Sequence, residues 1–582
     1  MIRYELSLIV TLVALLSFGK VHSQVITTRP GADTMKVVTL INADRLSYYR
    51  PDSSTELQTL AGHVQLKQEN TLFICDSAVL NKKTRFLEAF GNVHIIDNDT
   101  VNIRSQYLQY FIDTKLANLK NNVSLTDSKS TLYTNELQYD MNMKIGEFHN
   151  GGRLLNQQSV LTSKEGTYYE ELKDVYFKKD VDLKDPKYRL KTDSLLYNTA
   201  TQIATFIAPT TIIDSSKRVI NTSDGFYDTR NRKAFFGKRP VLHDGAVKII
   251  ADSIESDDST GISNLRGRAV YIDSAQGVSV LANSIKANRN DGTFLATQHP
   301  LMIIKQDKDS IYITADTLYS GRLSKMPGYK DTSKLQRDTA KRIAAELTLT
   351  NQPPANKKTG KATPAANKPA KAAATQNKND STDRYFQAWY HVRIFSDSMQ
   401  AVSDSLFYSG KDSIFKLFTD PIMWASKSQI TGDTIYLYTK NKNPDRLYVF
   451  ENGFAVNLSD KNMFNQMKGN RLNGYFNNGE IDYMRAQGNA ESIYYIKDEK
   501  NALVGINNAT SDIIDMRFKN KELHKVVFIS EVVGTMYPIK QAKEENKILR
   551  NFKWLEDKRP KTKFELFEDI KPVIKQDEEG KQ

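Results

Sequence analysis

The sequence has 582 residues, of which 40% are hydrophobic and 26% are charged. This is enough apolar material to bury a core, so the composition excludes a chain that is disordered throughout. A single cysteine, Cys75, excludes an intramolecular disulfide and a cysteine-rich zinc module. The eight histidines are scattered singly, which argues against a helical metal motif such as HExxH.

The net charge of +13 is unevenly distributed along the chain. Residues 324–380 contain 12 Lys or Arg against 4 Asp or Glu, whereas the long segments on either side are almost neutral. A nearly neutral body gives no electrostatic attraction to a phosphate backbone, so we do not expect a nucleic-acid partner.

The N-terminus has the features of a secretory signal. A short start containing Arg3 precedes an apolar run over 6–18, and Val21 and Ser23 occupy the −3 and −1 positions of a cleavage site. We therefore expect cleavage after Ser23. The mature chain is expected to be soluble and to lie outside the cytoplasm.

Internal repetition is the strongest signal in the sequence. One mark is a small residue, an Asp, a Ser or Thr, and an aliphatic residue, as in Ala251-Asp252-Ser253-Ile254. The Asp, or a polar substitute, recurs at positions 44, 76, 106, 135, 165, 193, 224, 252, 283 and 316. A period of roughly 30 residues that is kept over so many steps predicts a repeat architecture.

A second mark is a Gly or Pro followed by alternating aliphatic residues, as in Gly91-Asn92-Val93-His94-Ile95. It follows the first mark at a nearly constant spacing, as from Asp76 to Val93 and from Asp252 to Val270. Both marks lie in β-branched, period-two sequence bounded by turn residues. We predict two strands per repeat, each bent at a mark so that it crosses from one sheet to the other, with about 20 strands before residue 323.

The repeated Asp has a structural and a catalytic interpretation. A catalytic or metal-binding carboxylate would not be replaced by Gln106, Asn135 and Asn283. These residues share a short polar side chain that can bond nearby backbone at a bend, which favours the structural interpretation. We therefore predict no catalytic residues, no metal site and no cofactor.

The pattern predicts five segments. These are a signal peptide at 1–23, β repeats at 24–323, a disordered basic linker at 324–381, a second β segment at 382–539 and a charged C-terminal tail at 540–582. The linker is rich in Ala, Lys, Pro and Thr, and it interrupts one array of repeats.

The two repeated marks resemble those of the OstA-like family, which includes the LptA-type lipopolysaccharide transport proteins. The resemblance rests on recurrent Ala-Asp-Ser-Leu/Ile and Gly-Asn-Val-x-Ile behind a signal segment, and covers 38–323 and 385–560. The residues 488–495 and Asn551-Phe552-Lys553-Trp554 are similar to the long, two-segment members. The resemblance implies an elongated two-sheet β-jellyroll, or taco, whose interior carries lipid acyl chains. It also implies a periplasmic location, free or in association with the outer membrane. Exposed sheet edges would allow end-to-end pairing by strand addition, either in a homo-oligomer or with other transport-bridge proteins.

The expected function is binding of lipopolysaccharide or another acylated glycolipid in a groove lined by alternating aliphatic residues. The candidate liners are Val93, Ile95, Val123, Leu125, Val181, Leu183, Val270 and Ile272. Each of them is individually consistent with an ordinary core. A secreted structural or adhesin-like repeat protein and a β-helix carbohydrate-active enzyme are the alternatives. The enzyme would need acidic or basic residues clustered on one face of adjacent coils.

Overall fold

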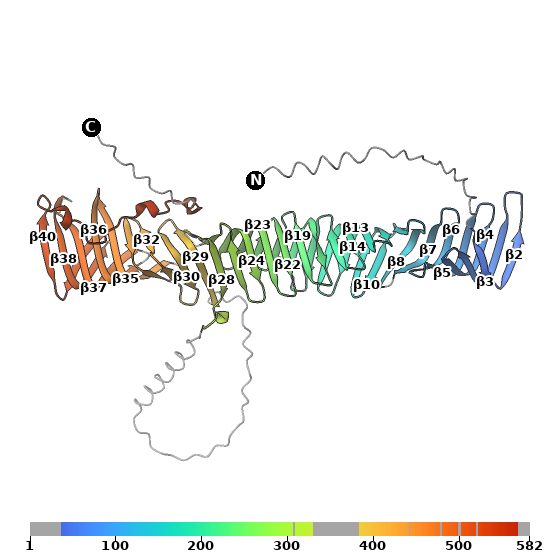
Figure 1. The fold of residues 1–582 in the computed structure, drawn as a ribbon, viewed down its shortest axis with the longest axis horizontal. Helices are drawn as coiled ribbons and strands as arrows, with labels where there is room; N and C mark the ends of the chain where they lie inside the picture. Colours follow the sequence, from blue (N-terminus) through green and yellow to red (C-terminus); the bar gives the residue numbers. More distant parts are fainter. Residues whose placement is uncertain are drawn as a thin grey trace, which may run out of the picture. The chain divides into compact units, whose positions relative to one another are not determined.

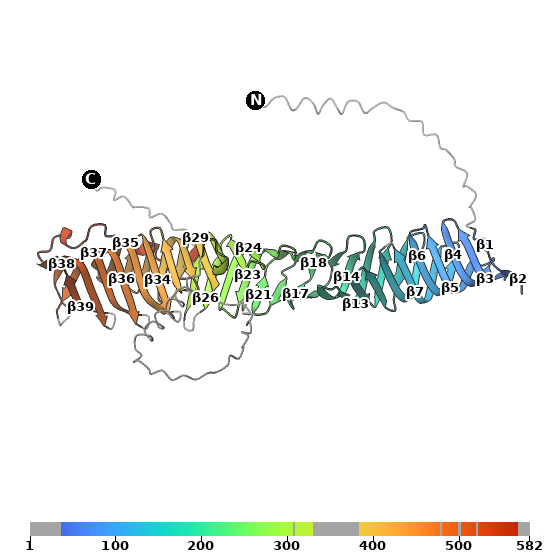
Figure 2. The same cartoon turned by 90° about the horizontal axis from the view of Figure 1, so that it is seen from below.

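The computed structural model describes residues 37–127, 129–305, 309–329, 383–440, 443–477, 480–498, 502–519 and 522–567. The expected signal peptide at 1–23 and residues 330–381 of the expected linker lie outside these ranges. Every regular element within them is a β-strand or a short 3-10 turn (Figures 1 and 2). The predicted all-β fold is therefore confirmed.

The chain divides into two compact units, of which the first ends at Glu147. Its strands are β1 (Thr39–Asn42), β2 (Arg45–Tyr49), β3 (Leu57–Gln68), β4 (Thr71–Asn81), β5 (Phe86–Asp97), β6 (Val101–Phe111), β7 (Leu116–Asp127), β8 (Ser130–Asp140) and β9 (Ile145–Phe148), the last of which reaches the unit boundary. Successive strands from β3 to β8 pair antiparallel with their neighbours in sequence.

The second unit begins at Phe148. Up to the expected linker its strands are β10 (Gly152–Asn156), β11 (Ser159–Ser163), β12 (Glu165–Tyr169), β13 (Asp174–Lys184), β14 (Tyr188–Asn198), β15 (Ile203–Phe206), β16 (Thr210–Asp214), β17 (Val219–Thr222), β18 (Asp224–Asp228), β19 (Lys233–Gly237), β20 (Val241–Asp244), β21 (Val247–Ile250), β22 (Ser253–Asp257), β23 (Ile262–Asp273), β24 (Val278–Asn288), β25 (Thr293–Thr297), β26 (Leu301–Lys305), β27 (Ser310–Thr314) and β28 (Thr317–Arg322). A 3-10 turn, η1 (Leu323–Lys325), follows.

The unit continues with β29 (Arg384–Phe395), β30 (Gln400–Ser409), β31 (Ile414–Phe418), β32 (Ile422–Ala425), β33 (Ser428–Thr431), β34 (Thr434–Lys440), β35 (Asn443–Asp460), β36 (Met463–Asn477), β37 (Glu480–Lys497), β38 (Leu503–Lys519), β39 (Glu522–Ile529) and β40 (Val533–Pro538). Because β28 pairs directly with β29, the strands on either side of residues 330–382 are neighbours. This is the arrangement expected of an insertion into one array. The five segment boundaries remain predictions.

The described residues up to Arg322 form 28 strands rather than about 20. The excess arises because several strands are divided where they bend. The halves β15 and β16, for example, both pair with the single long strand β14. The two-layer repeat is thus as predicted, and only the division into separate strands differs.

The bends, which we call corners, bring the two sequence marks together. In β5 the corner is Gly91 and Asn92, both with positive φ (71° and 41°). Asn92 Nδ2 donates to Asp76 Oδ2 of the neighbouring strand at 2.9 Å. A Cβ added at Gly91 would collide with the Asp76 carboxylate, so this position requires glycine.

The corner in β23 has the same construction. Gly267 and Arg268 have positive φ, and the Asp252 N–H donates to the Gly267 carbonyl at 2.8 Å. Arg268 Nη2 donates to Asp252 Oδ1 at 2.7 Å. This hydrogen bond from Arg268 lowers the pKa of the exposed Asp252 carboxyl. The Asp mark is therefore a partner of the corner, as the structural interpretation predicted.

Each corner separates a strand into two halves that belong to facing layers. In β5, residues 86–90 lie in what we call layer A and residues 93–97 in layer B, and they pair with 107–111 and 101–105 of β6, respectively. In β37 the corresponding halves are 483–487 and 490–497. The layers touch across the core, as where Phe73 of layer B packs 4.7 Å from Tyr110 of layer A, measured between ring centroids.

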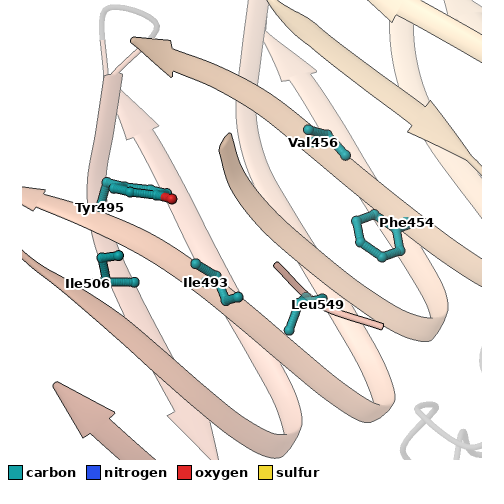
Figure 3. Close-up of a cluster of buried hydrophobic side chains, with 6 residues drawn as sticks. All are labelled: Phe454, Val456, Ile493, Tyr495, Ile506 and Leu549. Carbon is teal, nitrogen blue, oxygen red and sulfur yellow. The ribbon is translucent and has the colours of Figure 1, made fainter. Parts of the chain in front are cut away.

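Residues 539–567, nearly all of which belong to the expected charged tail, pack on the outer side of layer B. We call this segment the C-terminal strap; it contains the 3-10 turns η3 (Glu544–Asn546), η4 (Glu556–Lys558) and η5 (Glu565–Phe567). Leu549 is buried against Phe454, Val456, Ile493, Tyr495 and Ile506 (Figure 3). Phe552 and Trp554 of the strap pack on Phe464 with ring centroids 5.2 and 5.3 Å apart. Residues 568–582 of the expected tail lie outside the described ranges.

Buried glutamine side chains fix the strap by bonding its backbone. Gln466 of β36 donates to the Lys547 carbonyl and accepts from the Leu549 N–H, both at 2.8 Å. Gln429 of β33 makes the same pair of bonds with Lys553 and Leu555 at 2.8 and 2.7 Å. Both glutamines are almost fully buried, so the strap backbone satisfies polar groups that water does not reach.

We therefore expect Gln466→Leu to weaken the attachment of the strap by about 2 kcal/mol, because one N–H and one C=O of the strap lose their buried partner. Limited proteolysis should cut the variant faster within 539–567 than it cuts the wild type. Gln138→Leu, at an exposed position of β8, is the matched control and should behave as wild type. Equal cleavage rates for all three proteins would contradict this role.

Candidate lipid-binding interior

Six of the eight predicted groove residues face the space between the layers and are buried. They are at most 3% exposed, and they are Val93, Ile95, Val123, Leu125, Val181 and Leu183. All six follow a corner within layer B. The first four lie in the first unit and the last two in the second. Their side chains belong to a packed core and do not line an open surface.

The other two predicted residues, Val270 and Ile272, lie on the opposite side of β23. The corner at Gly267 and Arg268 makes Ala269 the first inward residue, and it is 1% exposed. Because side chains alternate along a strand, Val270 and Ile272 point outward, where both are half-buried. The predicted inward orientation of these two residues was wrong, and Ala269 and Tyr271 take their place.

In the first unit, polar contacts bridge the layers at the edge opposite the corners. The buried Gln68 of layer B accepts a hydrogen bond from the Tyr110 hydroxyl of layer A at 2.5 Å. Gln68 Nε2 also donates to the Ile112 carbonyl at 3.2 Å. Nearer the solvent, Lys115 and Glu69 form an ion pair at 2.6 Å. Burial raises the pKa of Tyr110, so the hydroxyl keeps the proton that it donates.

Similar bridges occur early in the second unit. Asn156 Nδ2 donates to the Thr199 carbonyl at 3.0 Å. Further along, Arg218 lies 2.6 Å from Asp214 and 3.5 Å from Asp258, and thus links a turn of layer B to a turn of layer A. The Tyr227 hydroxyl also donates to Asp258, at 3.1 Å. These contacts link the two layers at points between β10 and the turn after β22.

Next to the last of these bridges, inward apolar side chains are less completely covered. We call this region, from β21 to β26, the half-buried stretch. Its inward positions alternate with outward ones along each strand, and cross-strand pairs place them on a common side. The inward residues that keep intermediate exposure are Val247, Ile249, Tyr271, Val278, Phe294 and Ile304.

Polar groups accompany the apolar surface of the half-buried stretch. The Tyr271 ring of layer B lies 5.8 Å from the Phe294 ring of layer A. Burial raises the pKa of Tyr271, and the nearby Asp273 carboxylate adds to this effect while Arg384 opposes it. The Arg384 guanidinium is held by the Gly292 carbonyl at 2.6 Å. The stretch therefore combines an apolar interior with both signs of charge close by.

Sequence reasoning missed this stretch because its inward side chains alternate as regularly as those of the closed repeats. The difference lies in the bridging residues, such as Gln68 and Arg218, which are far from their partners in sequence. Among the described residues, no group of three or more His, Cys, Asp or Glu side chains is placed to hold a metal ion. No helix in the described ranges is long and apolar enough to cross a membrane.

Comparison with family models identifies the N-terminal repeats. Residues 35–193 and 189–252 match the model of the OstA-like protein family. Residues 35–252 are therefore similar to OstA-like proteins, and we call them the OstA-like segment. No individual curated protein matched the chain. The OstA-like segment holds six of the predicted groove residues and also Val247 and Ile249 of the half-buried stretch. Corners of the same type continue beyond it, at Gly267, Glu451 and Gly488, although the match ends at residue 252.

Proposed function

We propose that this protein binds lipopolysaccharide or a similar acylated glycolipid and serves in its transport or in outer-membrane assembly in the periplasm. The OstA-like segment supports this class of function. The observation that carries the proposal is the half-buried stretch, where inward apolar side chains between two layers remain partly accessible.

The proposed binding is non-covalent and involves no cofactor. Acyl chains gain about 0.8 kcal/mol for each CH₂ group that moves from water into an apolar interior. Val278 and Ile304, which are paired across β24 and β26, offer such an interior near the edge opposite the corners. The charged part of the lipid would remain at that edge, within reach of Arg384 and Asp273.

Lipid mass spectrometry of natively purified protein tests the proposal. Ile304→Glu places a carboxylate among the inward side chains of β26, and Ile303→Glu places one on the outward side of the same strand. Both residues are half-buried, so the two variants differ mainly in whether the new carboxylate points into or away from the interior. We expect acylated glycolipid on the wild type and on Ile303→Glu, and little on Ile304→Glu.

Circular dichroism must first show that both variants fold. Val123→Glu is less suitable for this test than Ile304→Glu. Val123 is only 1% exposed, and a carboxylate there would be buried without a partner. If the wild type carries no acylated lipid, the lipid-binding proposal fails, and a structural repeat protein becomes the better account. Equal lipid content in the two Ile variants would exclude the half-buried stretch as the site.

We further propose that the protein joins a second copy, or another transport-bridge protein, through its terminal strands. Among the described strands, β1 and β2 pair only with β3, and β39 and β40 pair only with β38. Both groups expose apolar side chains, with Tyr48 64% exposed on β2 and Val533 69% exposed on β40. A strand that is paired along one edge only and carries apolar side chains is a template for adding another strand.

Sedimentation velocity measures this association directly. Tyr48→Lys and Val533→Lys should each shift self-association to higher protein concentration, because a charge at the edge opposes strand addition. Met143→Lys, at a 70% exposed position in the turn after β8, is the control and should leave association unchanged. A wild type that stays monomeric at all concentrations would exclude a second copy as the partner.

A further inference from the structure

The outer face of layer A between β29 and β38 carries an unusual set of side chains. Outward residues such as Tyr436 and Tyr448 alternate with the buried Ile435, Leu437 and Val449. Pairing aligns the outward residues in rows across β29, β30, β31 and β34 to β38. We call this surface the aromatic–cationic face.

Positive charges are interleaved with the rings of this face. Lys416 Nζ lies 5.0 Å from the Tyr436 ring centroid and 5.6 Å from that of Phe407. The Arg446 guanidinium carbon lies 4.8 Å from the Tyr438 ring centroid. The guanidinium of Arg517 lies 5.6 Å from the Tyr483 ring. These distances are those of cation–π contacts.

The charge balance of the face is positive. Its described outward positions include Lys416, Arg446, Arg471, Arg485 and Arg517, and their rows contain one carboxylate, Asp515. Asp515 is bonded to Arg485 at 2.6 Å and to the Tyr483 hydroxyl at 2.6 Å. A second carboxylate, Asp445, contacts Arg446 at 3.0 Å. The remaining cations give the face complementarity to an anionic ligand.

The rings lie against one another and do not project from the surface. Tyr436 packs on Phe450 with centroids 4.9 Å apart, and Tyr475 packs on Tyr483 at 5.5 Å. Their exposure is intermediate, in contrast to the protruding Tyr48 on the terminal strand β2. A flush surface of this kind suits a ligand that stacks on it better than insertion into a membrane.

We propose that the aromatic–cationic face binds an acidic polysaccharide chain. Sugar rings present flat C–H surfaces that pack on aromatic rings, while arginines bond carboxylates with two parallel donors. Eight neighbouring strands at ~4.8 Å spacing give rows about 34 Å long, which fits an extended chain better than a single small molecule. This site lies outside the interior, and it does not depend on whether lipid binds there.

Isothermal titration calorimetry with alginate, a polymer of uronic acids, tests the proposal on the full-length protein. Arg446→Gln/Arg517→Gln removes two cations of the face, and Tyr448→Leu replaces a ring by an apolar side chain of another shape. The control is Arg153→Gln/Lys191→Gln, which removes two exposed cations elsewhere in the second unit. Neutral dextran, a thymidine oligonucleotide and phosphatidylglycerol vesicles serve as comparison ligands.

We expect alginate to bind the wild type and the control alike, and to bind the double arginine variant at least about tenfold more weakly, because charge-assisted bonds are lost. Tyr448→Leu should also weaken alginate binding. This second variant tests the face independently if the double arginine variant fails to fold. Equal binding of dextran, or alginate binding that is unchanged in both variants, would overturn the proposal. Tighter binding of the oligonucleotide or of the vesicles, with the same sensitivity to the variants, would overturn it in favour of that ligand.

Discussion

The structure depends on the corner at which each long strand passes from one layer to the other. In β5, β7 and β23 two successive residues at the corner adopt left-handed backbone conformations, which are unfavourable for most residues and persist only when the surroundings stabilise them. The stabilising group is a short polar side chain on the neighbouring strand, as where Asp76 accepts from Asn92 and Asp252 from Arg268. Because the corners in β5 and β23 each use such a partner, the two marks occur together there, and each of these strands is held in register against its neighbour.

Register in turn decides which side chains are inward, and this explains both the success and the failure of sequence reasoning. The period and the polar substitutions at Gln106 and Asn135 were enough to predict an all-β repeat with a structural Asp. The inward residue, however, is the one directly after the corner. In β23 this is Ala269, which follows Asp252 at the same spacing as Val93 follows Asp76. The prediction chose the more aliphatic Val270, one position further along the strand. A shift of one position exchanges the inward and outward side chains of a strand.

The C-terminal strap shows a different limit of sequence reasoning. The sequence predicted a charged tail here but not how the tail packs, and Leu549, Phe552 and Trp554 provide the apolar contacts that hold it. The anchoring residues Gln429 and Gln466 are far from the strap in sequence, 124 residues from Lys553 and 81 residues from Lys547, respectively. No local pattern identifies a glutamine that bonds distant backbone, so this packing emerges only in three dimensions.

The same two-layer fold thus provides three environments. They are a closed core, a half-buried interior and an outer face of aromatic rings and cations. The central claim is that acyl chains enter between the layers at the half-buried stretch. Photo-crosslinking tests it most directly, with a benzophenone amino acid placed at the inward position 249 or at the outward position 250 of β21. The account predicts crosslinks to acylated glycolipid from position 249 and few from position 250. Equal crosslinking from both positions, or none from position 249 in a folded protein, would contradict it.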